Sequence, residues 1–432
     1  MQNNKRFFGN KLPLAAAVTA ACLAMPALAV DFHGYARAGS SSNLNNGGEQ
    51  TCFGNGAEGH YVGRLADECD TYAELSLGDE LYNEDGRSFR FDSMVSYGAG
   101  NQGNDFQSFS YNDNGGAYDG GDISLRQFYV SGNNVVDALP GSTLWAGKRY
   151  YQRLDVHHLD LYYLNNSGYG AGVENISMGA GKLSVAYLNH DNRDDASGEF
   201  VQNNKFDVRY AFPLGDNTLT LVGVYAMADL TDQQEDLGIE DENGYHFLAE
   251  LASGFMGGFN KFVVQYGADS MGFTGFEAGG PGRVDNANVG GYLESSYRIL
   301  NHGVVKLSDK WELGYSALYQ AGEAHDNGAD DAERMSLVVR PVYNWSPISS
   351  TAIELGFDDV TYAGNAAEPD KESADLQKVA IAQQWQAGPG YWARPVIRLY
   401  AASFFGDQAK NARGGDGVDG DIQLGAQIEA WW

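Results

Sequence analysis

The chain ends in IQLGAQIEAWW, residues 422–432, in which two kinds of side chain alternate. Successive side chains of a β-strand point to opposite faces, so the odd and even positions of a strand here would meet different surroundings. The even positions are apolar and end in an aromatic ring: Ile422, Leu424, Ala426, Ile428, Ala430 and Trp432. The odd positions are mainly polar: Gln423, Gly425, Gln427, Glu429 and Trp431. This pattern is typical of a strand with lipid on one side and water on the other.

The same alternation recurs in other segments. Residues 30–38 place Val30, Phe32, Gly34, Ala36 and Ala38 opposite Asp31, His33, Tyr35 and Arg37. Residues 88–97 place Phe89, Phe91, Val95 and Tyr97 opposite Ser88, Arg90, Asp92 and Ser96, and only Ser93 and Met94 depart from the pattern. A soluble β-sandwich also alternates, so the pattern by itself leaves a sandwich and a membrane barrel open.

Length and composition favour a single all-β domain. The 432 residues include Gly 56, Tyr 26 and Phe 21 but only Pro 10, a composition rich in strand and turn formers. Beyond Val30 no run of eighteen apolar residues occurs, which excludes a helical membrane span. Clusters such as NNGG, NEDG and YNDNGG, at residues 45–48, 83–86 and 111–116, predict turns. A strand of about ten residues with its loops uses about twenty residues, so residues 30–432 predict one closed domain of roughly sixteen to twenty strands.

The N-terminus and the charge restrict location and partners. Residues 1–29 combine a basic start, an apolar stretch and a small-x-small cleavage site at residues 27–29, which predicts an export signal removed before Val30. The alternative, a lipid anchor on Cys22, lacks the usual preceding Leu. A formal net charge of −29 argues against a nucleic-acid partner, because binding a polyanion requires a basic face.

After removal of the export signal, Cys52 and Cys69 are the remaining cysteines. An even pair in an exported protein predicts one disulfide, here closing a short surface loop. The alternative is two free thiols.

Five aromatic residues fall on the polar face of their predicted strands: Tyr35, Tyr72, Phe259, Trp392 and Trp431. Trp392, for example, is in phase with Arg394 and Arg398 in a strand predicted over residues 391–401. The ordinary interpretation of each one is packing beneath an inward-folded loop. Together they favour a stacking path for sugar rings, whose faces are apolar C–H patches and whose rims carry hydroxyls. Arg37 and Glu74, on the same faces, would bind those hydroxyls.

Seven segments resemble the maltoporins, the maltodextrin-specific porins of Gram-negative outer membranes. They follow the family order along the chain: VDFHGYARAG (30–39), ECDTYAELSLG (68–78), LPGSTLWAGKRYYQRLDVH (139–157), GFNKFVVQY (258–266), AQQWQAG (382–388), WARPVIR (392–398) and GAQIEAWW (425–432). The resemblance implies an 18-stranded antiparallel transmembrane β-barrel, a homotrimer, and passive diffusion of maltose and maltodextrins. No long match covers residues 189–243 or 361–378, so chain-length preference is not determined.

The resemblance also implies roles for individual residues. The family's greasy slide, a line of aromatic rings, maps to the five aromatics above and to Phe106, where the family has a tryptophan that reaches into the neighbouring subunit's channel. The segment at residues 148–163 resembles the family's third loop, which folds inward and narrows the pore. The family's polar track maps to Arg37, Arg64, Glu74, Arg126, Arg153, Asp155, Asp160 and Tyr162. Simple alternation instead places Arg126 on the lipid face with Phe128 and Val130.

Other chemistries find less support in the sequence. Asp155 and Asp160 are a candidate glycosidase pair, but no nucleophile motif accompanies them, so an enzyme or adhesin in a barrel is the second hypothesis. His157 and His158 are adjacent and would face opposite ways on a strand, which is poor metal geometry. We expect no metal or cofactor, although Ca²⁺ at acidic clusters such as residues 240–242 and 330–331 stays open. A porin for another sugar such as sucrose, or a general porin, is also open.

Overall fold

The computed structural model describes residues 30–45, 47–54, 59–100, 122–193, 200–236, 243–272, 293–324, 331–361, 373–412 and 417–432. The predicted export segment, residues 1–29, lies outside these ranges, as do the acidic residues 240–242 and Asp330.

The described chain is almost entirely strand. The elements are β1 (Asp31–Asn43), β2 (Asp70–Glu84), β3 (Arg87–Gly100), β4 (Asp122–Asn133), β5 (Thr143–Arg149), β6 (Leu154–Val156), η2 (His157–Leu159), β7 (Leu161–Leu164), β8 (Gly168–Met178), β9 (Gly181–Arg193), β10 (Phe200–Leu214), β11 (Asn217–Asp229), α2 (Asp232–Asp236), β12 (Gly244–Phe255), β13 (Gly258–Asp269), β14 (Leu293–Lys306), β15 (Trp311–Ala324), β16 (Ala332–Ser346), β17 (Ser349–Thr361), β18 (Ala374–Gln386), β19 (Val396–Phe405), α3 (Asp407–Asn411) and β20 (Ile422–Trp431).

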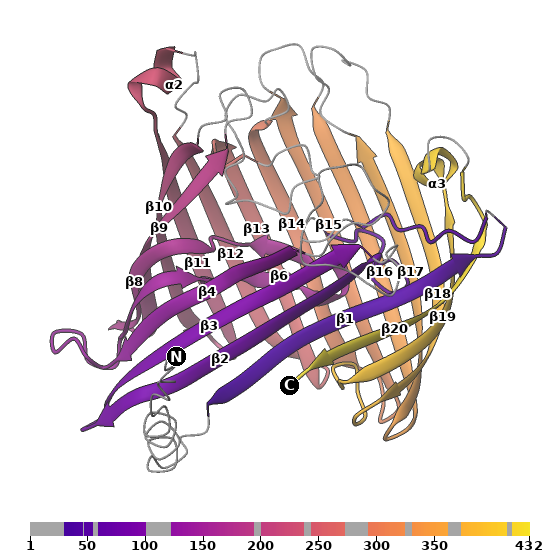
Figure 1. Ribbon diagram of the computed structural model, residues 1–432, viewed down its shortest axis with the longest axis horizontal. Coiled ribbons are helices and arrows are strands. Elements are labelled where there is room, and N and C mark those ends of the chain that lie inside the picture. Colours follow the sequence, from indigo (N-terminus) through magenta and orange to yellow (C-terminus); the bar gives the residue numbers. More distant parts are fainter. Residues whose placement is uncertain are drawn as a thin grey trace, which may run out of the picture.

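Eighteen of these strands form one sheet in which each strand pairs with its neighbour in the chain. The exception is β5, which pairs with β8 because β6 and β7 form a separate two-stranded hairpin. Antiparallel pairing of β1 with β20 closes the sheet into a barrel (Figure 1). The predicted 18-stranded antiparallel barrel is confirmed.

The two faces of the last strand confirm the alternation. Ile422 and Ile428 are 47% and 46% exposed on the outside of the barrel, whereas Gln423 and Glu429 are each 2% exposed on the inside. Exposed aromatic rings also cluster near the short turns, where Trp311 and Trp345 both contact Tyr343 and where Trp432 contacts Phe32. An apolar outer wall edged with aromatic rings matches a bilayer and its interface.

The two ends of the barrel differ in their connections. Tight turns join the strands at one end, as at Asp85–Gly86, where both residues have positive φ (51° and 77°) as the predicted NEDG turn requires. The five-residue helices α2 and α3 lie at the other end (Figure 1). No helix within the described ranges is long and apolar enough to cross a membrane.

The constriction loop, residues 150–167 between β5 and β8, folds into the barrel as predicted. Leu159, Leu161 and Leu164 are each 0% exposed. They pack against apolar residues of the inner wall: Val222, Val224, Leu248, Val263, Leu300, Leu318 and Val338. Burial of each leucine stabilises this arrangement by about 2 kcal/mol. The inner wall therefore carries an apolar patch where the constriction loop covers it.

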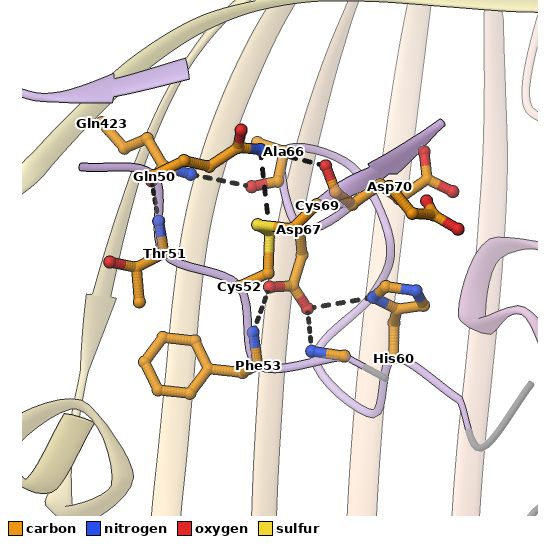
Figure 2. Close-up of a disulfide and its surroundings, with 12 residues drawn as sticks. Gln50, Thr51, Cys52, Phe53, His60, Ala66, Asp67, Cys69, Asp70 and Gln423 are labelled. Atoms are coloured by element: carbon orange, nitrogen blue, oxygen red, sulfur yellow. Dashed lines mark hydrogen bonds and ion pairs between the residues drawn. A yellow bond between two sulfur atoms is a disulfide. The ribbon is translucent and has the colours of Figure 1, made fainter. Parts of the chain in front are cut away.

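A second segment also folds inward. The predicted disulfide, Cys52–Cys69, is present and closes what we call the disulfide loop, residues 52–69 (Figure 2). The prediction of a surface loop was wrong, because Val62 and Leu65 are 1% and 2% exposed and pack against Val342, Ala352 and Ala380 on the inner face of β16, β17 and β18. Short-range sequence patterns do not show this docking, because β1 and β16–β18 come close only when β1 pairs with β20 and closes the barrel.

Two glycines permit this docking. Gly63 has a φ of +89°, and a Cβ there would lie 2.5 Å from Cδ of Glu354 on β17. A Cβ on Gly356, also on β17, would lie 2.0 Å from the carbonyl oxygen of Val62. Both positions therefore need glycine, because any side chain would push the disulfide loop away from the wall.

Candidate functional site

The five predicted aromatics line the inside of the barrel as a row, which we call the aromatic row. The rings of Tyr72 and Tyr35 lie 6.3 Å apart between centroids, and Tyr35 is the cross-strand partner of Trp431. Farther on, the rings of Trp392 and Phe259 stack at 6.4 Å. The five residues therefore form two stretches of the row, Tyr72, Tyr35 and Trp431 in one and Trp392 and Phe259 in the other.

His157 of the constriction loop fills the gap in this row. Its ring centroid lies 5.5 Å from that of Trp431 and 5.4 Å from that of Trp392. Sequence reasoning considered His157 only as a metal ligand and missed this position. No local signal could have found it, because η2 brings the ring to the row only after the constriction loop folds inward.

Trp392 lies on the row but not on a strand. The strand predicted over residues 391–401 begins only at Val396, and Trp392 belongs to the preceding turn. Pro395 lacks the N–H that a ladder pairing needs, which shortens the strand. The Trp392 ring is instead held between Phe259, His157 and Tyr391, whose ring lies 5.1 Å away.

The row borders a cavity of about 280 Å³. Its lining combines the aromatic rings of Phe259, Trp392 and Trp431 with the polar groups of Asp155, His157 and Lys261. Asp155, predicted for the polar track, is exposed in this part of the lumen. A ligand here would meet aromatic faces and charged groups together.

A first group of predicted polar residues gathers beside Tyr35. Arg37 donates to Asp160 Oδ2 at 2.5 Å and to both oxygens of Asp70 at 2.7 and 2.9 Å. Arg64 donates to Glu68 Oε1 at 2.6 Å and to the Tyr35 hydroxyl at 2.6 Å. Burial works against ionisation of Asp160, but Arg64 and Arg37 outweigh it and lower the pKa of its carboxyl group to about 2.

Glu429 connects this group to the aromatic row and was missed as a functional residue. Its Oε2 accepts hydrogen bonds from Arg394 at 2.7 Å and Arg398 at 2.9 Å. Its Oε1 accepts one from the Tyr35 hydroxyl at 3.2 Å and lies 3.1 Å from His157 Nε2. The available signal was its position two residues before Trp431 on the same strand face.

A second group surrounds Tyr150. The Tyr150 hydroxyl donates to Glu74 Oε1 at 3.0 Å and accepts a hydrogen bond from Arg126 Nε. Arg153 lies over the ring of Tyr150 at 3.4 Å and over that of Tyr162 at 4.4 Å. The structure thus brings four of the predicted polar residues together around one tyrosine.

Arg126 reaches this group through a β-bulge, and the alternation that placed it in lipid was wrong. Met94 pairs with Gln127 and the next residue, Val95, pairs with Leu125, so Arg126 has no cross-strand partner. The extra residue reverses the phase of β4, which leaves Leu125 and Phe128 both exposed on the outside. Arg126 is thereby free to turn inward.

Phe106, the sixth predicted slide residue, lies outside the described ranges.

The geometry does not favour the glycosidase alternative. A general acid needs a raised pKa so that it carries a proton near neutral pH. The pKa of Asp160 is lowered instead, and its carboxylate is bound to Arg37.

Comparisons with known proteins agree with this architecture. Residues 30–432 match the family model described as LamB porin. The chain is 39% identical over 432 residues to a maltoporin of Hahella chejuensis, covering 100% of this chain and 99% of the relative. Two solved structures share the fold: Acinetobacter baumannii OccAB2 (TM-score 0.50, 9% identity) and Pseudomonas aeruginosa OccK8 (TM-score 0.50, 11% identity), each covering 94% of this chain and 98% of the other. The chain therefore belongs to the LamB porin family and is a β-barrel porin of the Gram-negative outer membrane.

Proposed function

We propose that this porin carries maltose and linear maltodextrins by passive diffusion along the aromatic row. The observation that supports the proposal most strongly is a series of rings, completed by His157, beside a luminal cavity that Asp155 and Lys261 also line. Glucose units stack their C–H faces on aromatic rings and direct their hydroxyls sideways, so a row with a polar border fits a linear chain of them.

The polar groups suit a sliding ligand because they already bind one another. Arg37, Asp160 and Asp70 form ion pairs, and Glu74 accepts from Tyr72 at 2.7 Å. A sugar hydroxyl exchanges with an existing hydrogen bond, which keeps each binding step weak. Transport requires successive sites of similar, modest affinity, since a tight site would hold the sugar in place.

We also propose a homotrimer, as the family resemblance implies. In a trimer Phe106 of one subunit would extend a neighbour's aromatic row at its entrance. Phenylalanine stacks with less area than the family's tryptophan and has no N–H donor, which would weaken sugar capture at that position.

The test is ion current through the purified porin in a planar bilayer, titrated with maltohexaose and, separately, with sucrose. We expect saturable block by maltohexaose in the wild type. Trp392→Ala should raise the half-blocking concentration about tenfold, because one stacking contact is worth roughly 1 kcal/mol beyond its buried area. Trp385→Ala is the matched control, since Trp385 lies on the outer wall and is 44% exposed there.

Each other outcome points to a different channel. Stronger block by sucrose than by maltohexaose would assign the porin to another sugar. Current that neither sugar reduces would mean that the aromatic row is only packing, and the protein would be a general porin.

A further inference from the structure

His60 of the disulfide loop is a buried histidine with one nitrogen unused. It is 2% exposed, and its Nδ1 lies 3.2 Å from Asp67 Oδ2 (Figure 2). Asp67 also accepts from the backbone N–H groups of Phe53 and Gly54, at 2.7 and 3.1 Å. An ionised carboxylate only accepts, so Nδ1 carries a hydrogen. In the neutral imidazole Nε2 then has the lone pair, and Nε2 has no hydrogen-bond partner among the described residues.

Two carboxylates converge on this histidine. The ligating atoms of His60, Glu68 and Asp160 all lie within 4.8 Å of one another. His60 and Glu68 belong to the disulfide loop, whereas Asp160 belongs to the constriction loop. Two backbone hydrogen bonds join these loops, His60 N to Leu159 O at 2.5 Å and Arg64 N to His158 O at 3.0 Å. The three side chains are thus held close by the docking of one loop on the other.

The neighbouring arginines leave room for a cation. The contacts from Arg37 and Arg64 fall on Oδ2 of Asp160 and on Oε1 of Glu68. Each carboxylate keeps a second oxygen, and a carboxylate oxygen has lone pairs for more than one partner. Glu68, Asp70 and Asp160 contact Arg37 or Arg64, Asp67 contacts His60, and Glu429 joins Arg64 to Arg394 and Arg398. These five carboxylates face four guanidinium groups, so the described cluster carries an excess negative charge that a cation would offset.

We propose that His60 Nε2, Glu68 and Asp160 form a binding site for a first-row divalent cation of the Zn²⁺ class. One imidazole and two carboxylates suit this class and leave a fourth position open to water. Asp67 orients the imidazole in the way that carboxylates orient histidine ligands in metal sites. Gly54 is needed beside it, because a Cβ there would lie 1.7 Å from His60 Nδ1.

Occupation of this site would change the pore. The cation would cross-link the disulfide loop to the constriction loop and occupy Asp160, which belongs to the predicted polar track. It would thereby reduce the ion current through the pore. It would also leave fewer polar groups beside Tyr35 to form hydrogen bonds with sugar hydroxyls. The site does not depend on which sugar the porin carries, so it is tested without sugar.

The experiment titrates Zn²⁺ into the purified, metal-free porin and follows binding by calorimetry and ion current in a planar bilayer. We expect one strong site per chain and a matching decrease in current. His60→Ala should weaken binding at least tenfold, and His60→Asn should do the same while its amide N–H still donates to Asp67. His33→Ala is the matched control, because His33 lies exposed on β1 away from the cluster.

The decisive variant is His60→Asn. It keeps the hydrogen bond to Asp67, so it still tests the proposal if His60→Ala fails to fold. Equal Zn²⁺ affinity in His60→Asn and the wild type would overturn the proposal, as would the absence of a strong site. Binding of Ca²⁺ as tightly as Zn²⁺ would also overturn it, because it would show general attraction of cations to carboxylates and no role for the imidazole.

Discussion

The disulfide loop and the constriction loop both fold into the barrel, but different forces hold them. The disulfide loop is anchored by buried charge: Glu354, 0% exposed, accepts from Leu65 N and Arg340 and lies 2.9 Å from Lys378 Nζ. The constriction loop is anchored mainly by apolar packing of its leucines on an apolar patch of wall. The disulfide loop thus combines a buried ionic group with its apolar contacts, whereas leucines dominate the contacts of the constriction loop.

This difference predicts unequal responses to single substitutions. Loss of one member of a buried ionic group leaves the others unpaired in a medium of low polarity. Loss of part of a leucine leaves a cavity that the surroundings can partly fill. Loss of a stacking cation removes only a contact near water.

The largest effect is expected for Glu354→Ala. It leaves Arg340 and Lys378 without their carboxylate and should destabilise the docked disulfide loop by about 3–5 kcal/mol. Hydrogen exchange of the amides in residues 59–68 should accelerate far more than in residues 154–164. Arg87→Ala is the control, since the Arg87–Asp137 pair is exposed and should contribute less than about 1 kcal/mol. Equal acceleration in both loops would show that they are not anchored separately.

Leu161→Ala should destabilise the protein less than Glu354→Ala, and it should affect the constriction loop more than the disulfide loop. Leu161 is 0% exposed in the cluster beneath the constriction loop, and truncation should cost about 3 kcal/mol. Exchange should now accelerate in residues 154–164 first, with a rise in open-channel current as the constriction loosens. Leu44→Ala, at a position 58% exposed, should change neither quantity. Unchanged amide exchange in residues 154–164 of Leu161→Ala would show that apolar packing does not hold the constriction loop.

The smallest effect is expected for Arg153→Lys. Lysine keeps the charge but loses the planar stacking over Tyr150 and Tyr162, which should cost about 1 kcal/mol. The block by maltohexaose should weaken a few-fold, while exchange in the disulfide loop stays as in the wild type. Arg87→Lys provides the matched control. An effect as large as that of Leu161→Ala would mean that the stacked guanidinium, and not the leucines, holds the constriction loop.

Much of the fold follows from the sequence, because the strand period is local. The alternation at residues 422–432 and 30–38 needs no knowledge of the rest of the chain, and it correctly assigned Ile428 to the outside and Glu429 to the inside. The same phase argument placed Tyr35, Tyr72 and Trp431 in the lumen. The motifs shared with the maltoporins placed Arg126 in the lumen, whereas simple alternation placed it in lipid. The motif was right, because the bulge in β4 reverses the phase of the strand.

Other features depend on contacts that only the closed barrel creates. The strand faces, the turns, the disulfide partners and the residue types of the pore lining could be predicted from the amino acids, since each depends on neighbours a few residues away or on a match to a family. The docking of the disulfide loop on Glu354, the place of His157 in the aromatic row, and the contacts of Glu429 and His60 appear only in the folded barrel. These contacts join segments far apart in the chain, and barrel closure brings them together.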